Sequence, residues 1–336
     1  MPDHADRVLG CLLGAAYGDA LAAPAEFLSL EQILQRWPPD GPDDLTRTPS
    51  RVTDDTQMML AVGEALVEAR QHGPLSARTL EPALRRAFVT WLNDPENTRA
   101  PGMTCLRACE QLEQGLPWTT ATIAASKGCG ATMRAQPAGL LAGLDAATRA
   151  AIAQLQAALT HGHPTALAAA DLTAWTIHDL LAGGDLAGLV GRARSYAQSQ
   201  REIYRHDWLG DLWQQPGVDS PEGFIARGWD ECLRVIGRLE LALAAPDRAG
   251  DPCLATGAGW VAEESYATGL LCFLLFPDEP RRALQRAAAT SGDSDSIACL
   301  AGAFAGAHHG MAAWPPEWRE RIEYRDRLED LAARLA

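Results

Sequence analysis

The sequence predicts an all-α fold, a single compact multi-helix domain that spans residues 1–336. Alanine and leucine dominate the chain, and apolar side chains recur every three or four residues over most of its length, which is the spacing of one helix face. Runs of β-branched residues are nearly absent, and no alternating stretch is long enough for a convincing strand. Stretches rich in proline and glycine at 37–50 and 215–223 are interpreted as surface loops and not as linkers between domains.

The helices are placed by their apolar residues in chain order. The first three are marked by Val8, Leu9, Leu12 and Leu13, then by Met58, Met59, Val62 and Leu66, then by Leu80, Leu84, Phe88 and Trp91. Further helices are expected at 102–114, 131–143, 145–160, 164–182, 185–199, 221–244, 259–275, 279–289, 295–309 and 316–335. Gly115, Gly143 and Gly183 stand where C-terminal caps are needed, and Pro221 and Pro316 stand where helices begin.

Charge and cysteine usage limit the class of partner. The formal net charge is -14, from 29 basic and 43 acidic residues, so most of the surface repels nucleic acid and anionic lipid. We therefore expect no nucleic-acid or membrane partner. We also expect a monomer. The N-terminal apolar run is interrupted by Asp19 and lacks the basic start of a signal peptide. The eight cysteines form no Cys-x-x-Cys pair, which favours reduced, core-filling thiols and a cytoplasmic location.

Two short acidic motifs stand before helices. They are Thr53-Asp54-Asp55-Thr56 and Ser291-Gly292-Asp293-Ser294-Asp295-Ser296. Each motif by itself is best explained as a helix N-cap, because Thr, Ser and Asp are the preferred capping residues. A cap needs only one oxygen acceptor, however, and adjacent carboxylates repel each other unless a cation or a proton relieves them. Carboxylates and hydroxyls are ligands of hard divalent ions, so the two motifs together predict a two-metal site.

An EF-hand is the competing explanation of the second motif. It fails on spacing, because the sixth loop position would be Ala298 where glycine is required. The twelfth position would be Phe304 where the loop requires glutamate.

Three further features, a glycine loop, a histidine and a glutamate, each have two interpretations. The glycine loop at 127–134, Lys-Gly-Cys-Gly-Ala-Thr-Met-Arg, is either a tight turn or a backbone N–H site for a diphosphate at a helix start. His161, in the sequence His-Gly-His-Pro, is either a helix cap or a flat ring for stacking on a base. Glu26 is solvated unless it faces the acidic motifs.

Together and in this order, these segments resemble the ADP-ribosylglycohydrolase family. The resemblance runs from Gly10 to Gly310 and rests on ordered matches in seven segments. These are GCLLGAAYGDALAAPAEF (10–27), TDDTQM (53–58), RAPGMTC (99–105), SKGCGATMRAQPAGL (126–140), THGHPTALAAA (160–170), GWVAEESYATGLLCFL (259–274) and SGDSDSIACLAGAFAGAHHG (291–310). It implies an all-helical fold with two divalent metal ions, Mg²⁺ or Mn²⁺.

The resemblance also implies roles for individual residues. The metal ligands would be Thr53, Asp54, Asp55, Asp293, Asp295 and Ser296, and the catalytic residues would be Glu26 and Asp55. Substrate would be bound by Gly128, Cys129, Gly130, Ala131, Thr132 and Met133 at the diphosphate and by His161 at the adenine. Many members have asparagine where this chain has Cys129, and threonine is common where it has Ser294 and Ser296.

The function implied is metal-dependent hydrolysis of the N-glycosidic bond of an ADP-ribosylated protein. ADP-ribosylarginine is the expected substrate, and ADP-ribose is the product. The segment at Arg99 is a candidate neighbour of the acceptor residue. The alternatives are another ADP-ribosyl linkage (serine or small-molecule), another nucleotide or nucleoside glycoside, and an inactive ADP-ribose-binding protein. Inactive members usually lose acids from these motifs, whereas this chain keeps all four aspartates.

Overall fold

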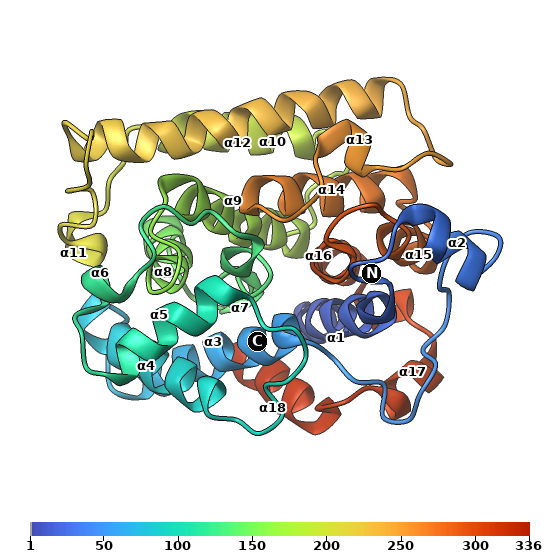
Figure 1. Ribbon diagram of the computed structural model, residues 1–336, viewed down its shortest axis with the longest axis horizontal. Coiled ribbons are helices and arrows are strands. Elements are labelled where there is room, and N and C mark those ends of the chain that lie inside the picture. Colours follow the sequence, from blue (N-terminus) through green and yellow to red (C-terminus); the bar gives the residue numbers. More distant parts are fainter. Residues whose placement is uncertain (1) are drawn as a thin grey trace.

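The computed structural model describes residues 2–336 and is all-α over that range (Figure 1). Its α-helices are α1 His4–Ala22, α2 Leu30–Arg36, α3 Asp54–Gln71, α4 Ala77–Leu92, α5 Met103–Glu113, α6 Trp118–Ala121, α7 Gln136–Leu140, α8 Ala146–Ala158, α9 Pro164–Leu181, α10 Leu189–Gln200, α11 His206–Leu209, α12 Pro221–Ala244, α13 Cys253–Thr256, α14 Ala262–Leu275, α15 Pro280–Ala288, α16 Ser294–His309, α17 Pro316–Arg321 and α18 Arg325–Leu335. Short 3₁₀ turns lie at Ala23–Ala25, Cys129–Ala131 and Gly310–Ala313. Within the described range, extended pairing is confined to isolated bridges such as Ser50 with Ile322.

Helices α1 and α16 form the centre of the fold, and they approach each other closely because glycines face the partner backbone. A Cβ atom placed on Gly18 of α1 would lie within 3.0 Å of three backbone atoms of Ala298 and Cys299 in α16. Gly14 and Gly302 face each other in the same way one turn further along. Figure 1 shows α1 and α16 side by side in the interior of the molecule. This contact places the end of α1 beside the first turn of α16, where the second acidic motif lies.

The other helices surround this pair. Helix α12 lies along one side of the molecule over α9 and α14, while α3, α4 and α5 lie on the opposite side (Figure 1). Almost all buried apolar residues belong to one continuous core, and a small satellite cluster is formed by Ala25, Ile33 and Ala289. One core agrees with the single compact domain expected from the sequence.

Most predicted helices are present, but two predictions need correction. The helix expected at 131–143 is a 3₁₀ turn at Cys129–Ala131 followed by the five-residue helix α7. The helix expected at 316–335 is divided into α17 and α18, because Tyr324 has a left-handed φ of 58°. The three glycines at predicted C-caps all have positive φ, between 78° and 81°.

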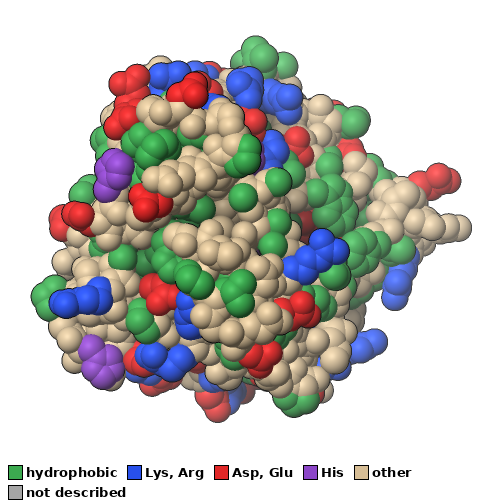
Figure 2. All heavy atoms as spheres, turned by 60° about the vertical axis from the view of Figure 1, so that its left-hand side comes forward, with side chains coloured by type: hydrophobic (Ala, Val, Ile, Leu, Met, Phe, Trp, Pro, Cys, Tyr) green, Lys and Arg blue, Asp and Glu red, His purple; other side chains and the backbone are tan. Residues whose placement is uncertain are grey.

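The N-terminal apolar run and most of the cysteines are buried in the core. The segment His4–Ala25 is long and apolar enough to cross a membrane by length and composition alone, and 83% of its most apolar window is buried inside this fold. All eight cysteines are free thiols, and seven are buried. On the face drawn in Figure 2, acidic and basic side chains are interspersed.

Candidate metal centre

The first acidic motif caps helix α3 and also places two buried carboxylates in its first turn. Thr53 is the N-cap of α3, where its Oγ1 accepts a hydrogen bond from the Asp55 N–H at 3.3 Å. Asp54 and Asp55 are buried in the first turn, and Asp54 Oδ2 accepts from the Gly102 N–H at 3.1 Å. Asp55 Oδ2 is buried without any hydrogen-bond partner. Capping therefore explains Thr53 but leaves the two carboxylates unexplained.

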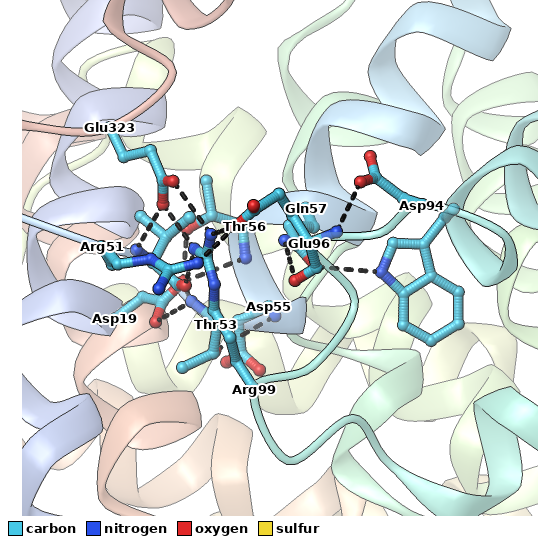
Figure 3. Close-up of polar contacts among 12 residues, drawn as sticks. Asp19, Arg51, Thr53, Asp55, Thr56, Gln57, Asp94, Glu96, Arg99 and Glu323 are labelled. Atoms are coloured by element: carbon cyan, nitrogen blue, oxygen red, sulfur yellow. Dashed lines mark hydrogen bonds and ion pairs between the residues drawn. The ribbon is translucent and has the colours of Figure 1, made fainter. Parts of the chain in front are cut away.

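Asp19 is a member of the site that the sequence analysis missed. It is fully buried on α1, and its carboxylate accepts from the Thr53 N–H at 2.9 Å, the Thr56 N–H at 3.1 Å and the Thr56 hydroxyl at 2.6 Å (Figure 3). The start of α3 is thereby fixed to α1. The signal in the sequence was a single acid inside an apolar helical run, where a carboxylate needs a specific partner.

The second motif meets the first in space. The Asp293 N–H donates to the Ala258 carbonyl at 2.8 Å, which sets the start of α16. Carboxylate oxygens of Glu26, Asp293 and Asp295 lie within 4.8 Å of one another. Ser294 points elsewhere, since its hydroxyl lies 2.9 Å from that of Thr290.

Six carboxylates thus form one acid cluster, defined here as Asp19, Glu26, Asp54, Asp55, Asp293 and Asp295. Burial raises the pKa of Asp19 and of Asp54 to about 7. Burial, and next the charges of Asp295 and Asp293, raise the pKa of Glu26 to about 10. The pKa values of Asp55 and Asp293 are raised well above their usual range by burial and by the charge of Asp295.

The donor set of the acid cluster fits divalent cations. Within residues 2–336, no lysine or arginine forms an ion pair with any of its carboxylates. A buried group of like charges without a counter-ion is stable only with protons or bound cations. Clustered carboxylate and hydroxyl oxygens are the ligands that Mg²⁺ and Mn²⁺ prefer, and the unpartnered Asp55 oxygen is free to serve as one.

The glycine loop contacts the acid cluster through Cys129. The Cys129 thiol lies 2.9 Å from Asp293 Oδ2 and donates to it. The N–H groups at 129 and 131–133 donate to carbonyls within the fold, such as the Cys129 N–H to Trp260. Ala131, Thr132 and Met133 are buried, so they support the loop from behind. Gly128 and Cys129 remain partly exposed at its surface.

His161 also lies behind this loop. Its side chain is 2% exposed, its Nδ1 lies 2.8 Å from the Thr160 hydroxyl, and its ring packs against Gly128 and Gly130. Burial and the nearby Arg134 charge lower its pKa well below the usual range, so the ring is neutral. The ring in this structure holds the glycine loop in place and presents no open face for a base.

A partly buried ion-pair network orders the chain just before α3. Arg99 bonds to the Glu323 carboxylate and to the Val52 carbonyl, while the Val52 N–H donates to Glu323 at 3.0 Å (Figure 3). Glu96 is paired with both Arg99 and Arg51. A cavity of about 600 Å³ opens beside this network and is lined by Glu26 and Thr53 of the candidate site and by Arg99.

The structure defines an all-α protein in which two acidic motifs meet at helix starts, and comparison with known proteins gives the family. A family model described as ADP-ribosylglycohydrolase matches residues 1–336, and the chain belongs to this family. Membership of this family supports an ADP-ribosyl glycohydrolase activity, the hydrolysis of ADP-ribosyl linkages, for this chain.

The relatives have related names. An ADP-ribosyl-[dinitrogen reductase] glycohydrolase of Rhodospirillum rubrum is 30% identical over 62% of this chain and 69% of its own length. The ADP-ribosylarginine hydrolase Tri1 of Pseudomonas putida is 26% identical over 99% of this chain and 79% of its own length. The bovine ADP-ribosylhydrolase ARH3 is 27% identical over 98% of this chain and 92% of its own length. A solved structure named as an ADP-ribosylglycohydrolase-related protein complex shares the fold, with a TM-score of 0.68 at 23% identity over 100% and 98% of the two chains.

Proposed function

We propose that this protein cleaves the N-glycosidic bond of ADP-ribosylarginine in a modified protein and releases ADP-ribose, with two divalent metal ions. One observation supports this most: six carboxylates, five of them buried, share a cluster in which none forms an ion pair with lysine or arginine within residues 2–336. Asp55 Oδ2 in this cluster has no hydrogen-bond partner. The arginine acceptor is supported by the relative Tri1, whose name specifies ADP-ribosylarginine. The names of the dinitrogen reductase glycohydrolase and of ARH3 specify no linkage, so another ADP-ribosyl linkage is the alternative. A monomeric, cytoplasmic protein remains part of the proposal.

The cations would be held by Thr53, Asp54, Asp55, Asp293, Asp295 and Ser296. When bound, ions of this kind supply Lewis-acid polarisation and a fixed charge that orients hydroxyl groups. Asp19 would hold these ligands in position, because it fixes the start of α3 to α1 through Thr53 and Thr56. Magnesium and manganese both suit such an oxygen-rich set.

The chain's own residues would then position substrate and water. Glu26 belongs both to the acid cluster and to the lining of the adjoining cavity, and its carboxylate would take a proton from an attacking water. Asp55, with its unpartnered oxygen, is the second candidate. A glycosidic transition state resembles an oxocarbenium ion, so the surrounding carboxylates would stabilise its positive charge.

The glycine loop would hold the diphosphate at its partly exposed part, Gly128 and Cys129. The thiol of Cys129 already donates to Asp293, so the loop and the acid cluster form one continuous surface for a ligand. Gly130 to Met133 would act by shaping this surface, and His161 by supporting it.

The proposal is tested by replacing Asp54 and Asp293 together with asparagine. We expect titration calorimetry to show no manganese binding, with the helical circular-dichroism spectrum retained and ADP-ribose release lost. Full activity in this double variant would refute the metal-dependent mechanism.

A further inference from the structure

The cavity beside the acid cluster has an unusual charge. Its lining includes four arginines and a single carboxylate, that of Glu26. The arginines are Arg36, Arg47, Arg51 and Arg99. In a protein with a net charge of -14, this is a local reversal of sign.

Two of these arginines are neutralised and two are not. Arg99 is paired with Glu323, and Arg51 is paired with Glu96. Arg36 and Arg47 form no ion pair within residues 2–336, and both side chains are exposed. The Arg36 guanidinium lies over the Trp37 ring at 4.5 Å, which leaves its outward N–H groups open to a ligand. The cavity therefore has two uncompensated positive charges and an aromatic ring beside them.

The cavity and the glycine loop meet the acid cluster at different residues. Glu26 and Thr53 belong to the cavity lining, whereas Cys129 contacts the cluster at Asp293 and is not part of that lining. If ADP-ribose lies on the glycine loop with its distal ribose at the acid cluster, the cavity is the space left for the group to which that ribose is attached.

We propose that this cavity is the acceptor subsite and that it selects acceptor segments with acidic residues next to the ADP-ribosylated side chain. The inference rests on the function proposed above. A modified guanidino group would face Glu26 and the acid cluster, while flanking carboxylates would pair with Arg36 and Arg47. The positive guanidino group of the substrate would thus face the negative acid cluster, and the negative flanking residues would face the positive arginines.

The test uses two peptides that each contain one ADP-ribosylarginine and differ only in flanking residues, which are aspartates in one and lysines in the other. Their affinities are measured by fluorescence anisotropy with chelator-treated protein, so that binding is read without turnover. Wild-type protein should bind the acidic peptide more tightly by on the order of tenfold, since each exposed charge pair contributes modestly. The ratio should approach one at high salt, because exposed charges are screened.

Variants assign the preference to the cavity. Arg36→Glu with Arg47→Glu should reverse the ratio and leave the affinity for free ADP-ribose unchanged. The matched control is Arg78→Glu with Arg238→Glu, two exposed arginines that lie outside the cavity lining and should not alter the ratio. Equal affinity of wild-type protein for both peptides would overturn the inference. So would a loss of free ADP-ribose binding in the Arg36→Glu and Arg47→Glu variant, because the cavity would then hold ADP-ribose itself.

Release of ADP-ribose, measured in parallel with metal added, separates this inference from the proposed function. Release from both peptides without any preference refutes the acidic-acceptor subsite and leaves the hydrolase standing. A clear preference in binding with release from neither peptide supports the subsite and refutes arginine as the acceptor that is cleaved.

Discussion

Replacing Gly18 with alanine should damage both the fold and the metal centre. The added Cβ would lie within 3.0 Å of three backbone atoms in α16, the nearest at 2.0 Å, so the two helices would have to separate by about 1.4 Å to restore an ordinary contact of 3.4 Å. Overpacking against rigid backbone costs about 3 kcal/mol, and the better helix propensity of alanine returns about 1 kcal/mol. We expect a net loss of about 2 kcal/mol in the free energy of unfolding.

The assay is urea unfolding followed by circular dichroism, with Gly237→Ala as the matched control. Gly237 is also inside a helix, α12, but its nearest neighbour to an added Cβ is the end of the Arg194 side chain at 3.5 Å. The free energy of unfolding of this control should increase by about 1 kcal/mol. Gly18→Ala should also weaken manganese binding by on the order of tenfold, because Asp19 and Asp295 lie on the two displaced helices. Equal stability of the two variants, or unchanged metal affinity in Gly18→Ala, would refute this role of the helix contact.

Three other predictions follow from the ionisable groups. Burial raises the pKa of Asp171 above its usual 3.8, so the contribution of Asp171 to folding stability falls as the pH rises above that value. The stability of Asp171→Asn relative to wild type, measured by urea unfolding, should therefore increase as the pH rises from about 4, and a pH-independent difference would contradict this. Glu323→Gln should cost about 2 kcal/mol of unfolding free energy by leaving the half-buried Arg99 underpaired. The control Glu329→Gln, in a more accessible pair with Arg319, should cost less than about 1 kcal/mol, and equal costs in thermal unfolding would argue against a special role for the Arg99–Glu323 pair. Manganese at about 100 times its Kd should stabilise the wild type by about 2.7 kcal/mol over chelator-treated protein, whereas an unchanged melting temperature would count against a metal site.

Much of the helical fold could be predicted because the apolar spacing and the caps act locally. Helix α12 begins and ends where proline and the apolar pattern place it, at Pro221 and Ala244. The long helix predicted at 131–143 is absent, because the apolar residues of this segment are buried by neighbouring helices without forming one long helix themselves. The break at Tyr324 could not be inferred either, because its left-handed backbone leaves no signal in residue type.

The site was only partly accessible from the sequence. The two acidic motifs and Glu26 could be named, partly from local chemistry and partly from the family resemblance. Asp19 and the supporting position of His161 depend on which helices pack together, and that is set by the glycine contacts between α1 and α16 and by the burial of the loop. The arginines of the cavity come from segments far apart in the chain, so only the fold brings them together.

The most direct test of the central claim is the release of free ADP-ribose from a protein that is modified on arginine. The reaction is run with manganese, with magnesium and with chelator. We predict release with a divalent ion and none with chelator. Release that persists in chelator would contradict the metal-dependent mechanism, and no release under any condition, with ADP-ribose still binding, would contradict arginine hydrolysis and point to another acceptor or to a protein that only binds ADP-ribose.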